Sequence, residues 1–220
     1  AEGARPGEGT RRQAAILFID IRSFTVMAAR LDADAVVAVL TAYQTRIVPI
    51  IHRHGGAIDK FLGDGIMATF GAVDHRPDFA AAALRALDDI IADTDGWVER
   101  SDALAQLPRG AVNGAAAAGE VIFGTLGNED RLEYTVIGAP VNLAAKLEKC
   151  NRPARARALT DAATFKLALA QGYVARPRPR RLRFAVSGAR QAVVLHEARK
   201  NPRPALAGRG RGPSRKAMGG

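Results

Sequence analysis

Two aspartates stand at positions where buried strands are expected to end. Asp20 follows the apolar run AAILFI at residues 14–19, and Asp64 lies 44 residues later, in a turn between two strand-like segments. Two carboxylates can hold a pair of divalent cations about 3.5–4 Å apart, and such a pair activates the attacking oxygen and neutralises the leaving group in phosphoryl transfer. Taken alone, each aspartate is more simply explained by local structure, Asp20 as a helix cap and Asp64 as a turn residue. The pair is therefore a hypothesis that other motifs must support.

A second set of polar residues lies on a predicted helix that starts at Pro140. Asn142 and Lys146 are four residues apart, so their side chains share one face of that helix. His52 and His54 end another predicted helix, where a histidine is expected to interact with the helix dipole rather than bind a metal.

The elements that must position these residues follow from apolar spacing and turn signals. The pattern predicts a strand at 14–20, helices at 24–30 (capped by Ser23), 33–54, 77–93 and 140–150, a hairpin of 57–62 and 65–71, and strands at 111–119, 120–127 and 132–138 with turns at Gly119 and Gly127. A final unit contains a strand at 158–160, a helix at 161–170 and strands near 173–177 and 191–198. The order β-α-α-β-β-α-β-β-α with later strands predicts an α+β fold, in which helices cover a mainly antiparallel sheet.

Composition and charge favour a single globular domain and argue against a dedicated nucleic-acid-binding protein. The 220 residues are 48% hydrophobic and 25% charged, which fits one globular domain. The net charge is +10, but five arginines in 176–183 and seven Lys or Arg in 199–220 carry it, and the remainder is nearly neutral. This distribution argues against a dedicated nucleic-acid face. The basic tail is expected to be disordered, with contact to anionic lipid or RNA as the alternative reading.

The cysteine content and the length of the apolar runs indicate in which cellular compartment the protein is expected. A single cysteine, Cys150, excludes an internal disulfide framework and favours a reducing, cytoplasmic setting. No apolar run approaches the roughly 18 residues of a membrane span, and the N-terminus does not resemble a signal peptide. The chain begins with Ala, so an upstream sensor or membrane domain missing from it remains open, and the domain could be the cytoplasmic part of a membrane-anchored protein.

Three ordered motifs give a more specific indication. FIDIRSFT at 18–25, GGAIDKFLGDGIMATFG at 55–71 and YTVIGAPVNLAAKLE at 134–148 together resemble the class III nucleotidyl cyclase catalytic domain, of the bacterial type. The resemblance covers residues 14–198, between a flexible segment at 1–13 and the basic tail at 199–220. It implies a ferredoxin-like βαββαβ core with additional strands and helices, and a head-to-tail homodimer whose active sites are built from both partners.

The resemblance assigns a metal and phosphate site. It makes Asp20 and Asp64 the carboxylate ligands of two divalent cations, Mg²⁺ or Mn²⁺, with the backbone carbonyl of Ile21 as a further ligand. In the family, the ribose 3′-hydroxyl attacks the α-phosphate to give a cyclic nucleotide and pyrophosphate. Phe24 and Thr25 would lie at the helix start that faces the phosphates, where free N–H groups favour anions. Phe24 also fits a simple core position.

The resemblance also assigns purine-reading residues. Lys60 matches the lysine of adenylyl cyclases, which can donate to adenine N1, whereas guanylyl cyclases usually carry an acid there. Outside the family, an exposed strand lysine would be the simpler interpretation. Thr135 matches the second position, where many adenylyl cyclases have aspartate and a subgroup has threonine. Its hydroxyl can accept from the adenine amino group but can also donate, so it discriminates less sharply than a carboxylate. ATP is favoured over GTP.

The predicted helix at 140–150 and the C-terminal part of the chain depart from the family pattern. Asn142 matches the asparagine that orients the ribose, but Lys146 stands where an arginine usually stabilises the transition state, and lysine lacks the planar fork that holds two phosphate oxygens. Ser187 replaces the usual triphosphate-binding lysine, a loss that Arg190, Arg180, Arg181 or Arg183 could offset. Arg131 is a further candidate phosphate contact.

Two functions follow from these residues. The first is an adenylate cyclase, a phosphorus-oxygen lyase for intracellular signalling, with activity weakened by Lys146 and Ser187. The alternative is a degenerate cyclase domain that binds nucleotide or a partner without turnover, and guanylate cyclase activity is the substrate-level alternative.

Overall fold

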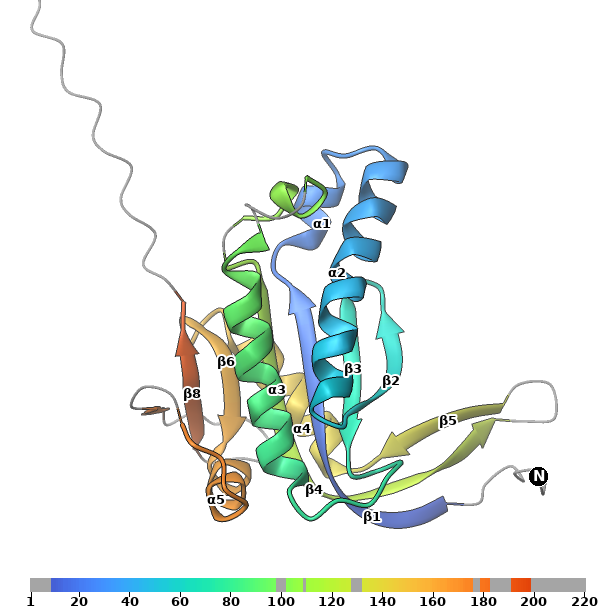
Figure 1. Cartoon of the computed structure of the whole chain (residues 1–220), viewed down its shortest axis with the longest axis vertical. Helices are drawn as coiled ribbons and strands as arrows, with labels where there is room; N and C mark the ends of the chain where they lie inside the picture. The colour runs from blue at the N-terminus through green and yellow to red at the C-terminus, as the bar shows by residue number, and fades with distance from the viewer. Residues whose placement is uncertain are drawn as a thin grey trace, which may run out of the picture.

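A twisted sheet forms the centre of the molecule (Figure 1). The structure is a computed structural model that describes residues 9–97, 102–108, 110–127, 132–175, 179–182 and 191–198. The eight strands are β1 (Gly9–Ile21), β2 (Ala57–Leu62), β3 (Gly65–Phe70), β4 (Val112–Gly127), β5 (Leu132–Ile137), β6 (Ala156–Asp161), β7 (Arg180–Leu182) and β8 (Ala192–Glu197). The helices are α1 (Phe24–Ala28), α2 (Ala33–Arg53), α3 (Phe79–Thr94), the 3₁₀ turn η2 (Leu104–Gln106), α4 (Ala139–Cys150) and α5 (Ala162–Ala170).

The sheet is mainly antiparallel, as the sequence predicts. Its strand order is β2-β3-β1-β4-β6-β8-β7, with β5 paired to β4, and the β4–β6 pair is parallel. The order β1, α1 and α2, β2, β3, α3, β4 gives the expected βαββαβ core. The α+β fold class is therefore confirmed.

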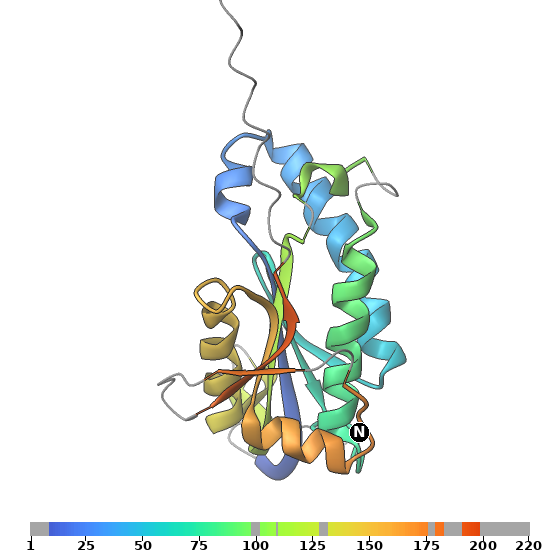
Figure 2. The same cartoon turned by 90° about the vertical axis from the view of Figure 1, so that its left-hand side faces the viewer.

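Helices cover both faces of the sheet, and β1 shows why. Ala15, Leu17 and Ile19 belong to the core beneath α2 and α3, whereas Ala14 and Ile16 pack with Ala144 of α4. Successive side chains of a strand point to opposite faces, so an uninterrupted apolar run predicts a strand buried on both sides. Figure 2 shows the result, with α4 on one face of the sheet and α2 and α3 on the other.

Helix α2 differs from the sequence-based expectation about membrane-spanning segments. By length and composition it is apolar enough to cross a membrane, contrary to the expectation that no segment is. Its buried side chains, however, form one face that belongs to the main core: Val39, Tyr43, Ile47, Ile50 and Ile51. A helix that packs in the core can therefore have the length and composition of a membrane span.

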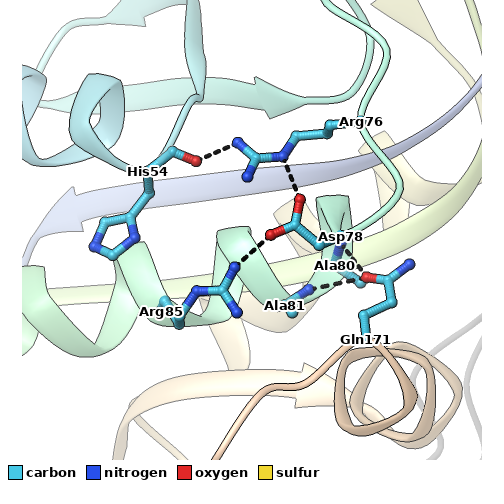
Figure 3. A network of polar contacts seen from close by, with 7 residues as sticks. All are labelled: His54, Arg76, Asp78, Ala80, Ala81, Arg85 and Gln171. Atoms are coloured by element: carbon cyan, nitrogen blue, oxygen red, sulfur yellow. Dashed lines mark hydrogen bonds and ion pairs between the residues drawn. The ribbon is translucent and has the colours of Figure 1, made fainter.

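A polar network fixes the start of α3 (Figure 3). Asp78 precedes the helix but does not cap it, because its carboxylate accepts from Arg76 Nε at 2.8 Å and from Arg85. Arg76 also donates to the carbonyl of His54 at the end of α2. Gln171, after α5, takes the capping role: its Oε1 accepts from the backbone N–H groups of residues 80 and 81 at 2.9 and 3.1 Å. The network ties α2, α3 and α5 together.

Several local predictions prove wrong. Gly119 does not form a turn. Strand β4 continues through it, because every residue of β1 pairs with β4, between Val112 and Gly124. β4 does end at Gly127, as predicted, and the antiparallel strand β5 begins at Leu132, while residues 128–131 lie outside the described residues. Ser23 occupies the N-cap position of α1 as predicted, but it has a left-handed φ of 58° and its side chain makes no capping hydrogen bond within the described part of the chain; the helix ends at Ala28, two residues earlier than expected. No strand forms at 173–175, residues 176–178 lie outside the described residues, and β7 pairs with β8 instead.

Candidate active site

The two predicted metal aspartates lie together at one end of the sheet. Asp20 is the penultimate residue of β1, and Asp64 occupies the tight turn between β2 and β3. Because β1 and β3 are neighbours, with Ile19 opposite Ile66, the strand end and the turn meet. The two carboxylates share a hydrogen bond, and Asp20 Oδ1 also accepts from the N–H of Ile21 at 2.8 Å.

This arrangement is electrostatically unfavourable without a cation. Burial raises the pKa of Asp20 to about 7, together with the hydrogen bond that protonated Asp20 donates to Asp64 and the charges of Asp64 and Glu148. A like charge beside a partly buried carboxylate disfavours its ionisation, and a divalent cation removes that penalty. Within the described ranges, no set of three or more His, Cys, Asp or Glu side chains is arranged as a metal cluster. Two hard carboxylate oxygens with backbone and substrate oxygens nevertheless suit Mg²⁺ or Mn²⁺.

A third carboxylate beside the pair was not predicted from the sequence. Glu148 of α4 accepts a hydrogen bond from Asn113 Nδ2 at 2.5 Å, and Asn113 Oδ1 accepts from Arg22 Nε at 2.9 Å. Asn113 is opposite Asp20 in the β1–β4 ladder, so the hydrogen bonds that join Arg22, Asn113 and Glu148 lie directly beside the aspartates. Burial raises the pKa of Glu148, and Asp64 adds to the rise, while Asn113, Lys149 and Arg22 lower it.

The residues predicted to face the phosphates follow the aspartate directly. Ile21 ends β1 and is buried, and its carbonyl remains a predicted ligand. Phe24 begins α1 and packs against the main core, in agreement with its structural reading, whereas Thr25 is exposed. Helix α1 has only five residues, so it supplies few free N–H groups.

The two predicted purine-reading residues contact each other. Lys60 of β2 donates from Nζ to Oγ1 of Thr135 on β5 at 3.1 Å. Lys60 Nζ also donates to Glu133 Oε1 at 2.9 Å. Burial alone would lower the pKa of Lys60, but Glu133 and Asp59 outweigh that effect and raise it. The lysine is therefore cationic and already directed at Thr135.

Asp59 is a further member of this cluster that sequence reasoning missed. Its Oδ1 accepts the Thr135 hydroxyl at 3.0 Å and lies 3.3 Å from Lys60 Nζ. Ile58 pairs with Ala68 and Lys60 with Met67, so Asp59 is the extra residue of a β-bulge. The only feature of the sequence that could have indicated Asp59 as a site residue is its position next to Lys60. We call Asp59, Lys60, Glu133 and Thr135 the Lys60 cluster.

Asn142 and Lys146 lie on α4, which begins at Ala139 with proline in its first turn. Both side chains are exposed, one helical turn apart, while Ala144 and Leu147 of the same helix are buried against the sheet. The helix therefore holds the two polar residues on its outer surface, as their spacing predicts.

Comparison with known proteins gives the family. Residues 8–180 match the family model described as the adenylate and guanylate cyclase catalytic domain. The chain belongs to this family. Two uncharacterized proteins of Mycobacterium tuberculosis are similar to this cyclase domain, at 35% identity over 170 residues and 36% over 172, each covering 76% of the chain. The chain spans only 28% and 30% of the length of these relatives.

Solved cyclase structures share the fold of this cyclase domain. The adenylyl cyclase CyaB from P. aeruginosa is 28% identical with a TM-score of 0.73, and the match covers 88% of this chain and 98% of that one. A bacterial light-regulated adenylyl cyclase is 26% identical with a TM-score of 0.75, over 88% and 54% of the two chains. The guanylyl cyclase Cya2 is 28% identical with a TM-score of 0.65, over 90% and 97%. Both substrate classes thus occur among the similar structures.

The structure describes only some of the remaining predicted residues of the cyclase domain. Arg131, Arg183, Ser187 and Arg190 lie outside the described residues. Arg180 donates to Glu197 at 2.9 Å and to the carbonyl of Ala154 at 3.1 Å, and Arg181 is exposed. His54 lies 2.8 Å from Asp89 Oδ2, and His52 is exposed.

Proposed function

We propose that this cyclase domain is an adenylate cyclase, which converts ATP to 3′,5′-cyclic AMP and pyrophosphate for intracellular signalling. The observation that carries the proposal is the contact between Lys60 and Thr135. A cationic lysine offers only donors, which suits the unprotonated N1 of adenine and conflicts with the N1–H of guanine. Thr135, 8% exposed, lies where it could accept from the adenine amino group.

The aspartate pair is the proposed metal site. Asp20, Asp64 and the carbonyl of Ile21 would hold two divalent cations, Mg²⁺ or Mn²⁺. When bound, these ions would promote attack by the ribose 3′-hydroxyl on the α-phosphate and neutralise the departing pyrophosphate. The burial and charge repulsion that raise the pKa of Asp20 support this assignment, because they favour a bound cation.

Asp59 and Lys60 lie on β2 and Thr135 on β5, whereas Asp20 and Asp64 lie at the end of β1 and in the β2–β3 turn. We infer that a homodimer joins the Lys60 cluster of one subunit to the aspartates of the other. The arm of β4 and β5 extends beyond the helices (Figure 1). It exposes large apolar side chains, which favour an interface: Ile122, Leu126, Tyr134 and Ile137. A hollow of about 210 Å³ on this arm is lined by residues that include Thr135. Ligand pockets usually measure about 300–1,000 Å³, so a second subunit would have to complete this one.

Helix α4 supplies the proposed catalytic pair. Asn142 would orient the ribose, and Lys146 would stabilise the negative charge that develops on the phosphates. Their exposure on one helical face supports access to a nucleotide held between subunits. Lys146 keeps the charge of the usual arginine without its bidentate geometry, so we expect weakened turnover.

Cyclic nucleotide production by the purified chain tests the substrate class. The assay compares ATP with GTP, in Mg²⁺ and in Mn²⁺, beside Asp64→Ala. We expect cyclic AMP from the wild type and none from the variant. Glu120→Gln, an exposed carboxylate on β4, is the matched control and should retain activity. A preference for GTP would overturn the proposed role of Lys60.

Complementation tests the shared site. Asp64→Ala and Lys60→Ala should each be inactive as homodimers. Mixed heterodimers contain one intact site, so up to half of the wild-type activity per heterodimer should return. Purified heterodimers that remain silent would contradict the two-subunit arrangement, without contradicting the substrate class.

A degenerate domain that binds nucleotide without turnover is the second candidate. The observation in its favour is Lys146 in place of arginine, together with Ser187 at the position of the triphosphate lysine. It predicts a folded, dimeric chain that binds ATP by calorimetry and makes no cyclic AMP with either metal. The retained aspartate pair favours the enzyme.

A further inference from the structure

The bulge in β2 brings a buried acid to the proposed purine-reading position. In a regular strand, neighbouring side chains point to opposite faces, so Asp59 and Lys60 would diverge. The extra residue of a bulge breaks that alternation and re-aims a side chain. As a result, Asp59 and Lys60 both reach Thr135 Oγ1, at 3.0 and 3.1 Å.

The hydrogen-bond inventory of the threonine hydroxyl decides what it can offer a ligand. A hydroxyl has one hydrogen and two acceptor lone pairs. The hydrogen of Thr135 is donated to Asp59 Oδ1, and one lone pair accepts from Lys60 Nζ. One acceptor site therefore remains, and no donor. Thr135 lines the hollow on the β4–β5 arm, so this remaining site is the one that a base can meet.

We propose that Asp59 is a specificity-positioning residue, which makes Thr135 an obligate acceptor and so lets a threonine act as a carboxylate would toward adenine. The inference rests on the proposed function. Adenine presents an amino donor at its six-position, whereas guanine presents a carbonyl acceptor there. A freely rotating threonine could serve either base. With its hydrogen held by Asp59, it accepts from the adenine amino group and cannot donate to the guanine carbonyl.

The burial of Asp59 fits this role better than that of a surface acid. Its side chain is only 4% exposed. A buried carboxylate is costly unless it is paired and hydrogen-bonded, and Lys60 and Thr135 supply that compensation. The acid is thereby held in one orientation, so the direction of the Thr135 hydroxyl is fixed before a nucleotide arrives.

A double-mutant cycle on substrate selectivity tests the proposal. The measured quantity is kcat/KM for ATP divided by that for GTP, in the wild type, Asp59→Ala, Thr135→Val and the double variant. We expect each single variant to lower this ratio by roughly tenfold, the scale of one mismatched hydrogen bond. The double variant should show no further loss, because Asp59 acts through the hydroxyl. Additive losses would overturn the proposal, since Asp59 would then act through Lys60 or through packing.

A second pair of variants keeps the test open if Asp59→Ala does not fold. Thr135→Ser retains the hydroxyl and its acceptor, so its ATP-to-GTP ratio should stay within about threefold of wild type, while Thr135→Val falls. Equal losses in both variants would overturn the inference. Binding of 3′-deoxy-ATP and 3′-deoxy-GTP, measured by calorimetry, should show the same order without turnover.

These outcomes separate the inference from the function on which it rests. A wild type that prefers GTP contradicts both. A wild type that prefers ATP, with a ratio unchanged by Asp59→Ala, contradicts only the role of Asp59. Asp34→Ala, an exposed aspartate in the first turn of α2, is the matched control and should leave the ratio unchanged.

Discussion

Asn113 donates a hydrogen bond to Glu148 over 2.5 Å and so anchors a third carboxylate beside the aspartate pair. Asn113 belongs to β4 and Glu148 to α4, and Arg22 holds the other end of the same amide at 2.9 Å. The charge of Glu148 reaches Asp20 and contributes to its raised pKa. The electrostatics of the proposed metal site therefore depend on three acids, of which two are predicted ligands.

Replacement of Glu148 by glutamine should weaken divalent cation binding. The variant keeps an oxygen that Asn113 can reach but removes one negative charge near the pair. We expect roughly fivefold weaker Mn²⁺ binding, about 1 kcal/mol of screened attraction. Titration of free Mn²⁺ by electron paramagnetic resonance measures this without turnover. Glu120→Gln is the matched control and should bind as the wild type does. Equal affinity in Glu148→Gln would show that this acid does not influence the ion.

Glu133 should compete with the nucleotide for Lys60. In the structure Lys60 donates to Glu133 at 2.9 Å, and an N–H of this lysine must turn to the purine if the proposed role is right. Exposed ion pairs contribute about 0.2–1 kcal/mol, so Glu133→Gln should lower the KM for ATP by up to about fivefold, with kcat little changed. Steady-state kinetics measure both constants. A raised KM would indicate instead that Glu133 helps to position the lysine.

The acid side of the stability profile should depend on Asp78. The hydrogen bond from Arg76 lowers its pKa, and Arg85 adds to the effect (Figure 3). A depressed pKa in the folded state contributes stability above the pKa of the unfolded chain, and that contribution is lost as the pH falls through the folded value. Asp78→Asn should therefore lower the free energy of unfolding by roughly 0.5–1 kcal/mol at pH 7, and the difference should shrink below about pH 4.

Urea unfolding at several pH values measures the contribution of Asp78. Asp74→Asn, an exposed carboxylate just before the network, is the matched control and should unfold as the wild type does. A difference between Asp78→Asn and wild type that persists unchanged at low pH would contradict the electrostatic explanation. It would then reflect packing at the start of α3.

Local signals explain why much of the fold could be predicted from the sequence. The apolar run of β1 and the Gly63-Asp64 turn are encoded by adjacent residues, and they bring Asp20 and Asp64 together. The turn predicted near residue 119 failed because a glycine weakens a strand locally, whereas the full-length pairing with β1 overrides that tendency.

The missed site residues depend on contacts distant in sequence. Asp59 reaches Thr135 across 76 positions through a bulge, and Asn113 reaches Glu148 across 35. No spacing rule along one element reveals such pairs. A bulge in particular shifts which side chains share a face, and it becomes visible only once the strand register is known.

Lys146→Arg should raise turnover if bidentate phosphate contact limits the proposed reaction. The planar guanidinium can hold two phosphate oxygens, and lysine presents a point charge. Lost electrostatic stabilisers of a transition state cost one to three orders of magnitude, so we expect kcat to rise by roughly tenfold or more with little change in KM. Lys149→Arg is the matched control, since it makes the same exchange at another exposed position of α4. An unchanged kcat in Lys146→Arg would show that positive charge alone suffices. If the wild type is silent, cyclic AMP from Lys146→Arg combined with Ser187→Lys would identify these two departures as the cause.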